Sequence, residues 1–359
     1  MRSRVWTALA VAALGGACVH EAPFRIVEEP PRGPFATASP RRLTFNQGQD
    51  LAPGWLPDGS AIVYSLERVD RPDRDRCLGF LPPEGGSLLR IVCNRRFVAD
   101  DSTDAYEEPA VGPNGLIAFE RSSATIGFLS YRFRALVVAP ADSPAGARGR
   151  ALLSLPYQLP GSPYHYGISH LRWLSDHSLV YVGDLVGYDK RRQDQPIDTI
   201  VSGLDIVRAT LAGDSAIVEP LVGTAYATSV AVGPGGDDLY YTVGGDSRVF
   251  RRILASGATS VARDFAPQGI ARDVSVAGGR LAAVVGGDVT FAFELGFGDY
   301  AQRDAGGLLH VVDLGTGAET VLDGRGLLFR HPALSPDGTR IVAEAYAGRQ
   351  ADLWLLEVP

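Results

Sequence analysis

The sequence predicts an all-β fold, a six-bladed β-propeller built from four-stranded antiparallel blades. The main observation is a short motif that occurs six times: an apolar stretch, a tight turn and a second apolar stretch. Its clearest copies are 52–63 and 331–342, and both carry Pro-Asp-Gly at the turn. Proline presets φ for a reversal and glycine adopts the left-handed conformation without strain, so each copy predicts a β-hairpin.

Four weaker copies lie between these two, at 108–115, 170–177, 229–236 and 274–279. The six turns recur at intervals of 43 to 62 residues, which is the length of one propeller blade. Each blade of a closed ring buries its faces against two neighbours, so a single ring can occupy most of a 359-residue chain. We therefore expect one large domain.

Composition and the absence of certain motifs exclude several classes of function. The net charge is −7, which argues against a nucleic-acid surface. The sequence has no nucleophile-elbow serine motif, no phosphate-cradling loop and no paired-cysteine metal motif. We predict no catalytic residue, no metal site and no cofactor, and we expect a monomer.

Residues 1–18 are predicted to be a targeting segment. Arg2 and Arg4 precede an apolar run that is too short to span a membrane as a mature helix, and small residues lead to Cys18. This stretch resembles a bacterial lipobox, which implies cleavage before Cys18 and its lipidation. Val19 favours the outer membrane over the inner, on the periplasmic side. The alternative is an ordinary signal peptide with an incidental cysteine.

Residues 19–40 are rich in proline and lack a periodic apolar pattern, so we expect an extended tether between the membrane and the domain. The propeller is expected to occupy residues 41–359.

The first copy carries a resemblance to a known family. Arg41 to Thr44, Gly48 and the stretch from Pro53 to Gly59 are similar to the repeat of TolB-type six-bladed β-propellers, and the likeness continues through 78–92. The resemblance implies the fold far more than an activity. TolB carries an α/β domain before its propeller, whereas here a signal-like segment and a tether precede it. The partnership of TolB with a peptidoglycan-associated lipoprotein is therefore not transferred.

The third and fourth strands of each blade follow from stretches dense in valine, isoleucine and leucine. The paired stretches are 78–81 with 88–92, 133–139 with 151–155, 204–209 with 216–222, 249–255 with 259–264, and 308–314 with 319–322. The sixth blade has three strands of its own, the last at 352–358. We expect residues 42–45 to supply its fourth strand and to close the ring.

Cys77 and Cys93 lie on either side of a Glu-Gly-Gly turn, at equal distances from Gly85. In an antiparallel hairpin this symmetry places them opposite each other, where a disulfide can form, and an exported compartment permits the bond. The alternative is two thiols shifted out of register by one residue.

Aligning the six copies predicts a polar ring at the mouth of the central channel, where each innermost strand begins. The aligned positions are Ala52, Glu108, His170, Ser229, Arg272 and His331, with Glu107, Arg330 and Asp273 beside them. Such a ring can hold an anionic or peptide ligand, or a metal. Alternatively, these residues serve only solvation and strand packing in a water-filled channel.

The face that bears this mouth is expected to carry the long polar loops, which are the usual place for recognition. These loops are 67–76, 94–107, 121–131, 183–202 and 294–306. The acidic run 100–104 and the basic cluster 190–192 are interpreted as solvated loops, and Trp55 and Trp173 as core residues. His165 and His177 are expected in loops or turns, and His310 in a strand.

The function predicted from these observations is a lipid-anchored, exported propeller that binds an envelope protein or peptide. The alternative is a propeller enzyme, a lyase or hydrolase, with a polar or metal site at the channel mouth. The bacterial envelope is the expected location in both cases.

Overall fold

A computed structural model describes residues 39–68, 76–93, 102–125, 130–142, 150–154, 164–187, 200–287, 290–294, 299–303, 306–347 and 350–359. The signal segment with Cys18, nearly all of the tether and the basic cluster 190–192 lie outside these residues. Within the described part, no helix has both the length and the apolar character needed to cross a membrane.

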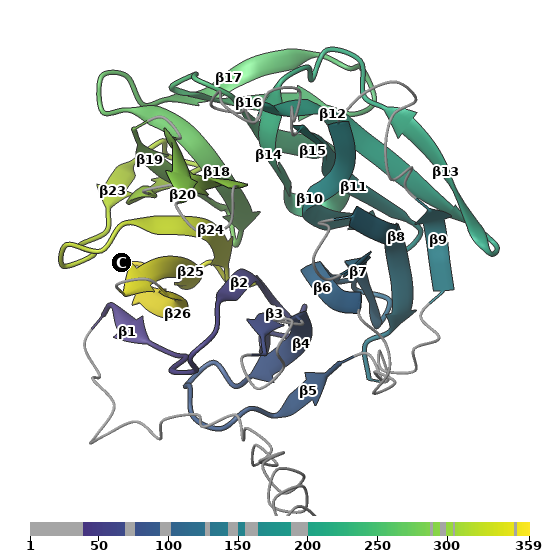
Figure 1. Ribbon diagram of the computed structural model, residues 1–359. Helices are drawn as coiled ribbons and strands as arrows, with labels where there is room; N and C mark the ends of the chain where they lie inside the picture. The colour runs from purple at the N-terminus through teal and green to yellow at the C-terminus, as the bar shows by residue number, and fades with distance from the viewer. Residues whose placement is uncertain are drawn as a thin grey trace, which may run out of the picture.

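Six blades of antiparallel strands surround a central axis, which confirms the predicted six-bladed propeller (Figure 1). Blade 1 is β2 (Asp50–Trp55), β3 (Ile62–Glu67), β4 (Arg76–Leu81) and β5 (Arg90–Val92); blade 2 is β6 (Ser102–Val111), β7 (Leu116–Thr125), β8 (Ser130–Pro140) and β9 (Arg150–Ser154); blade 3 is β10 (Tyr164–Ser175), β11 (Ser178–Gly187), β12 (Ile200–Ala212) and β13 (Ser215–Pro220).

The second half of the ring is built in the same way. Blade 4 is β14 (Ala227–Val232), β15 (Asp238–Val243), β16 (Arg248–Ile253) and β17 (Thr259–Asp264), with a 3-10 turn at Pro234–Gly236; blade 5 is β18 (Ile270–Ala277), β19 (Arg280–Gly286), β22 (Gly307–Asp313) and β23 (Glu319–Val321); blade 6 is β24 (Phe329–Leu334), β25 (Arg340–Ala347), β26 (Gln350–Glu357) and β1 (Arg41–Arg42). The hairpin of β20 (Thr290–Glu294) and β21 (Asp299–Arg303) extends from blade 5.

The N-terminal strand closes the ring, as predicted. β1 pairs antiparallel with β26, with Arg42 opposite Trp354. Beyond the strand, the backbone N–H of Leu43 donates to the carbonyl of Leu353 (2.7 Å), and the N–H of Leu353 donates to Oγ1 of Thr44 (2.9 Å). Strand β1 thus covers an edge of blade 6 that would otherwise be unpaired.

The core lies between the blades. The buried apolar side chains of the described residues form six clusters, one at each boundary between neighbouring blades. At the boundary of blades 1 and 2, for example, Phe80 and Val63 pack against Phe119 and Ile117. Each strand presents valine, isoleucine or leucine to a neighbouring sheet, and this explains the density of these residues in the sequence.

Both tryptophans of the repeat tie neighbouring blades together. Trp55 is buried, and its Nε1–H donates to the carbonyl of Ala333 in blade 6 (2.9 Å). Trp173 is half-buried, and its Nε1–H donates to the carbonyl of Ala110 in blade 2 (2.9 Å). The predicted core position is therefore also a link between blades, because a buried indole N–H needs an acceptor.

Cys77 and Cys93 form a disulfide across β4 and the residue that follows β5, with Cα atoms 4.5 Å apart. The register places Leu78 opposite Val92, so the two cysteines face each other one step further along the hairpin.

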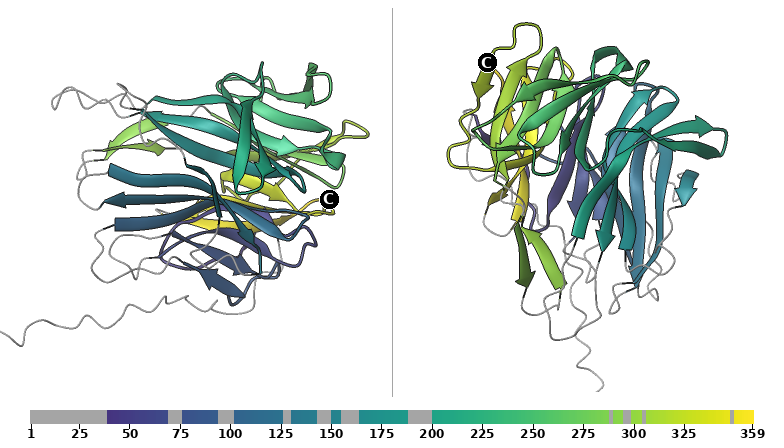
Figure 2. Two further views of the ribbon diagram at one scale, coloured as in Figure 1. Left: turned by 90° about the vertical axis from the view of Figure 1, so that its right-hand side faces the viewer. Right: turned by 90° about the horizontal axis from the view of Figure 1, so that it is seen from above.

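Several stretches expected as loops are strands instead. β6 begins at Ser102, β7 continues to Thr125 and β8 begins at Ser130, so much of 94–107 and 121–131 is paired backbone. Parts of 183–202 and 294–306 are strands as well, and His165 lies in β10. An antiparallel pair satisfies its backbone hydrogen bonds whatever its side chains are, so the polar composition of these stretches did not exclude strands. Figure 2 shows them projecting on one side of the ring.

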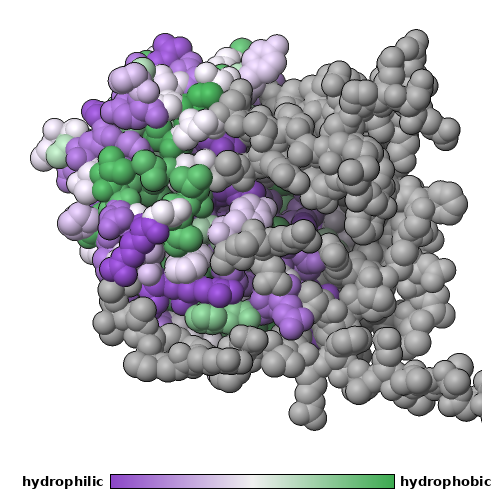
Figure 3. Space-filling view, turned by 60° about the vertical axis from the view of Figure 1, so that its left-hand side comes forward, coloured by the Kyte–Doolittle hydropathy of each residue, from purple (hydrophilic) through white to green (hydrophobic). Residues whose placement is uncertain are grey.

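The outer flank of the ring at blades 5 and 6 mixes polar and apolar surface (Figure 3). Leu308, Val321 and Leu328 are among the exposed apolar side chains of the described residues.

Candidate functional site

Each innermost strand of the ring contains a break in register at about the same place. Four of the six aligned residues lie in these β-bulges with positive φ: Ala52 (48°), Glu108 (53°), His170 (52°) and His331 (42°). A residue with a side chain costs roughly 1–3 kcal/mol in such a conformation. β-Bulges occur often beside functional sites because they redirect a side chain.

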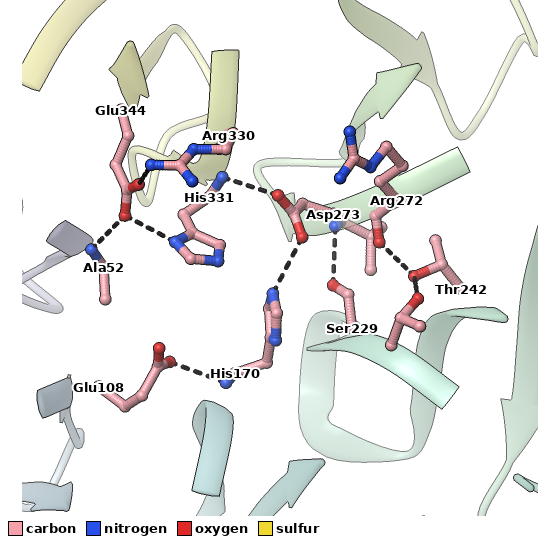
Figure 4. A network of polar contacts seen from close by, with 12 residues as sticks. Ala52, Glu108, His170, Ser229, Thr242, Arg272, Asp273, Arg330, His331 and Glu344 are labelled. Carbon is pink, nitrogen blue, oxygen red and sulfur yellow. Dashed lines mark hydrogen bonds and ion pairs between the residues drawn. The ribbon is translucent and has the colours of Figure 1, made fainter. Parts of the chain in front are cut away.

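Carboxylates of one blade accept hydrogen bonds from the bulged backbone of another blade (Figure 4). Oε2 of Glu108 accepts from the N–H of His170 (2.8 Å), and Oδ2 of Asp273 accepts from the N–H of His331 (2.9 Å). Oε1 of Glu344 accepts from the N–H of Ala52 (2.5 Å). Each contact satisfies a backbone donor that the bulge removes from its own sheet. Part of the polar ring is therefore structural.

Polar residues on the second strands serve the same purpose. Oγ–H of Ser65 donates to the carbonyl of Tyr106 (2.7 Å), and Oε2 of Glu120 accepts from the N–H of Ile168 (2.8 Å). Corresponding positions in blades 4 and 6 hold Thr242, which donates to the carbonyl of Arg272, and Glu344.

Three side chains meet in the channel, and each keeps at least one polar atom that these backbone contacts do not use: His170, Asp273 and His331. They come from blades 3, 5 and 6, and one possible ligand atom of each lies within 4.8 Å of the other two. Nε2 of His170 is 3.1 Å from Oδ1 of Asp273, and the two imidazole rings are 5.1 Å apart in an edge-to-face arrangement. His170 and Asp273 are buried, and His331 is about one-third exposed (31%).

Glu344 orients His331. It is fully buried, and its Oε1 accepts a hydrogen bond from Nδ1 of His331 (2.6 Å), while Arg330 forms an ion pair with Oε2 (3.0 Å). Because Nδ1 is occupied, Nε2 is the nitrogen of His331 that remains for the channel. Figure 4 shows the ring of His170 reaching Asp273, the backbone of His331 joined to Asp273, and the ring of His331 joined to Glu344.

Neighbouring opposite charges in this cluster stabilise the charged forms of His331 and Asp273. Burial alone would lower the pKa of His331, but the carboxylates of Glu344 and Asp273 raise it to about 10. Burial alone would raise the pKa of Asp273, but the charge of His331 and the hydrogen bond from His170 hold it well below its usual range. At neutral pH the cluster therefore contains an imidazolium between two carboxylates.

The other residues of the predicted ring do not join the three-residue cluster directly. Oγ of Ser229 accepts from the N–H of Val274 (2.9 Å), and Arg272 is buried with its guanidinium 3.5 Å from the carbonyl of Gly306, so neither joins the three-residue cluster. Arg330 contributes through Glu344. Glu107 forms an ion pair with Arg76 of blade 1 and lies away from the cluster.

The depth of the site differs from the prediction. In blades 2 and 3, Glu108 and His170 are preceded in their strands by residues 102–107 and 164–169. At about 3.3 Å per residue these segments rise roughly 20 Å beyond the bulge. The aligned residues therefore do not lie where these strands begin, and the site is recessed below the projecting hairpins.

Sequence reasoning missed Glu344 and Glu120, and it named Asp273 only as a neighbour of the ring. A usable signal was present, since each of the two glutamates interrupts an apolar second strand, in Ile341-Val-Ala-Glu and in Ile117-Ala-Phe-Glu. A charged residue at the centre of an apolar strand must be paired if it is buried.

No protein-family model matches the sequence, and no curated protein matches it. Solved structures of similar fold include TolB from Acinetobacter baumannii, with 15% identity and a TM-score of 0.51 over 84% of this chain. The match covers 64% of the TolB chain, so this chain spans less than two-thirds of that protein. A gluconolactonase from Xanthomonas campestris matches with 16% identity and a TM-score of 0.51, over 94% of this chain and 95% of its own. At these identities the likeness shows a β-propeller and leaves the activity open.

Proposed function

We propose that this chain is an exported β-propeller that binds a protein or peptide of the bacterial envelope at the mouth of its channel. The observation that supports this proposal is the cluster of His170, Asp273 and His331, recessed below the hairpins of blades 2 and 3. Peptides offer carboxylate and amide groups that hydrogen-bond to fixed charged side chains. The hairpins around the cluster provide further surface for a partner of that size.

The envelope location rests on the sequence. Residues 1–18 resemble a lipoprotein signal, and a proline-rich stretch separates Cys18 from the first strand. Lipid at Cys18 would hold the propeller at the membrane surface, and residues 19–40 are long enough to keep the binding face accessible. The TolB-type fold is consistent with this location.

The proposal is tested by crosslinking and affinity capture of the lipidated protein from its native envelope, with quantitative identification of the captured proteins. We compare wild type with the double variant His170→Gln, His331→Gln. The control is His310→Gln, because His310 is also a buried histidine paired with a carboxylate, Glu319 (2.6 Å), but lies outside the channel cluster. We expect specific partners to be lost in the double variant alone. Equal recovery in all three would remove the channel mouth from the binding function.

A second candidate function is hydrolysis. The observation that favours it is the convergence of two histidines and a carboxylate in one recessed site, a set suited to acid–base catalysis. The gluconolactonase of similar fold suggests lactones as first substrates. Turnover of gluconolactone by wild type that is lost in His170→Gln and retained in His310→Gln would support this candidate, and no turnover by wild type would count against it for that substrate.

A further inference from the structure

We propose that His170, Asp273 and His331 bind one divalent transition-metal ion, each residue through one side-chain atom. This inference concerns the same channel site as the proposed function, but it does not depend on a protein partner. The type of ion is inferred from the donor atoms that the three side chains offer.

The donor set points to the class of metal. Two imidazole nitrogens and one carboxylate oxygen are typical ligands of Zn²⁺, Mn²⁺ and Fe²⁺. Ca²⁺ and Mg²⁺ prefer sites made entirely of oxygen atoms, so two histidines disfavour them. Three protein ligands leave further coordination positions, and these face the channel, where water or a ligand can reach the ion.

The spacing is close to that of a bound ion. Ligands at about 2.1 Å from one metal lie roughly 3.0–3.5 Å from each other. Nε2 of His170 and Oδ1 of Asp273, a hydrogen-bonded pair, already have this separation, 3.1 Å, and one possible ligand atom of each of the three residues lies within 4.8 Å of the other two. His331 must therefore approach by roughly 1–2 Å. Its side chain is 31% exposed, so it has room to do so.

The surroundings orient the ligands as metal sites require. Nδ1 of His331 donates to the buried carboxylate of Glu344, which leaves Nε2 for the cluster. A ligating imidazole is neutral at the bound nitrogen, so the ion would take the place of the proton on Nε2, and that proton would be released on binding. Oδ2 of Asp273 accepts from the N–H of His331, which leaves Oδ1 for the ion. A metal-bound histidine usually donates its second nitrogen to a carboxylate or a carbonyl, which fixes its tautomer and ring orientation. His331 has such a partner, whereas Nδ1 of His170 has none among the described residues.

A second observation marks the site. Nδ1 of His170 is buried and has no hydrogen-bond partner among the described residues. A buried polar atom without a partner is rare in folded proteins and is found at sites with a further role. Together with the positive φ of His170 and His331, it indicates that the fold tolerates local cost to bring these rings together.

The three ligands belong to blades 3, 5 and 6, so a bound ion would connect blades across the channel. An ion that binds only the folded protein raises its stability with concentration. The melting temperature of the chain should therefore rise with added metal, and this readout is independent of any catalytic activity.

The test uses the full chain, freed of metal with a chelator and then titrated with Zn²⁺ and with Mn²⁺. Metal content after dialysis and isothermal titration calorimetry measure stoichiometry and affinity for wild type, His170→Gln, His331→Gln and the His310→Gln control. We expect one ion per chain, with affinity reduced about 100-fold or more in the first two variants, at least the loss that removal of an outer-shell partner causes. His310→Gln should bind as wild type does.

Less than one ion per chain in wild type, or equal affinity in His170→Gln and wild type, would overturn the proposal. If a channel variant does not fold, the absorption spectrum of the Co²⁺-loaded wild type and anomalous diffraction at the metal edge locate the ligands directly. Partner capture repeated in the presence of chelator separates this inference from the proposed function. Capture that persists without metal would support the binding function independently of the ion, and metal binding is then decided by the calorimetry and metal content alone.

Discussion

The backbone N–H of Leu43 lies 2.7 Å from the carbonyl oxygen of Leu353, and this contact joins the two ends of the described chain. Around it, the buried side chain of Leu43 packs in one cluster with Leu355 of β26 and Trp55 of blade 1. The closure of the ring is thus a hydrophobic contact as well as a ladder of hydrogen bonds, and its strength can be measured.

We predict that Leu43→Ala lowers the free energy of unfolding by about 2–5 kcal/mol, the usual cost of truncating a buried leucine. Leu43 is 1% exposed, whereas Leu89 is 61% exposed. Leu89→Ala is therefore the matched control, with an expected change within about 0.5 kcal/mol. Urea unfolding followed by circular dichroism measures both. Equal effects of the two substitutions would show that the seam does not hold the ring closed.

We predict that Asp352 makes the protein less stable as the pH rises from about 4 to about 6. Burial raises the pKa of Asp352 from 3.8 to about 6, although the ion pair with Arg42 (2.8 Å) opposes the shift. The folded protein binds this proton more tightly than the unfolded chain, so the stabilisation is complete below the unfolded pKa and is lost as the pH passes the folded one. Asp50, which is buried nearby, has its pKa raised for the same reason.

The measurement is the free energy of unfolding of wild type and Asp352→Asn at pH 4 and at pH 7. Wild type should lose stability relative to the variant between these values. A constant difference between the two proteins would show that Asp352 does not titrate in this window.

Reduction of the disulfide between Cys77 and Cys93 should lower the free energy of unfolding by about 3 kcal/mol, because the bond closes a loop of 16 residues in the unfolded chain. The double variant Cys77→Ala, Cys93→Ala should be destabilised similarly and should not respond to reductant. Thermal unfolding with and without dithiothreitol provides the comparison. A wild type whose melting temperature is unchanged by dithiothreitol would contradict the prediction.

The fold could be predicted from the sequence because the turn residues and apolar stretches that specify it are local and recur along the chain. The turns at Gly59 and Gly338 specify hairpins by residue type, and the stretch at 352–358 without a fourth strand indicated that an N-terminal strand must close the ring. The extensions of β6 and β7 could not be predicted from the sequence, because stretches such as 102–104 and 121–123 have the polar composition of a loop.

The candidate site could be predicted from the sequence only in part. Alignment of the first strands placed His170 and His331 at one repeat position, and both lie in the cluster. The predicted ring also included Glu107, which instead forms an ion pair with Arg76. Side chains alternate between the two faces of a strand, and the β-bulge between Glu107 and Ala110 shifts that alternation. Glu344 lies on a second strand, so alignment of the first strands could not find it.

The buried carboxylate of Glu344 is bonded to His331, Arg330 and the backbone of Ala52. Glu344→Gln keeps the shape but removes the charge that compensates two cations, and leaving a buried charge unpaired costs about 3–5 kcal/mol. Glu219→Gln is the control, because Glu219 and its partner Arg208 are exposed and such pairs contribute about 1 kcal/mol or less. Urea unfolding at neutral pH should show a large loss of stability in Glu344→Gln alone. If Glu344→Gln were as stable as Glu219→Gln, the network around His331 would carry no net electrostatic stabilisation, and the orientation of His331 would have to come from packing instead.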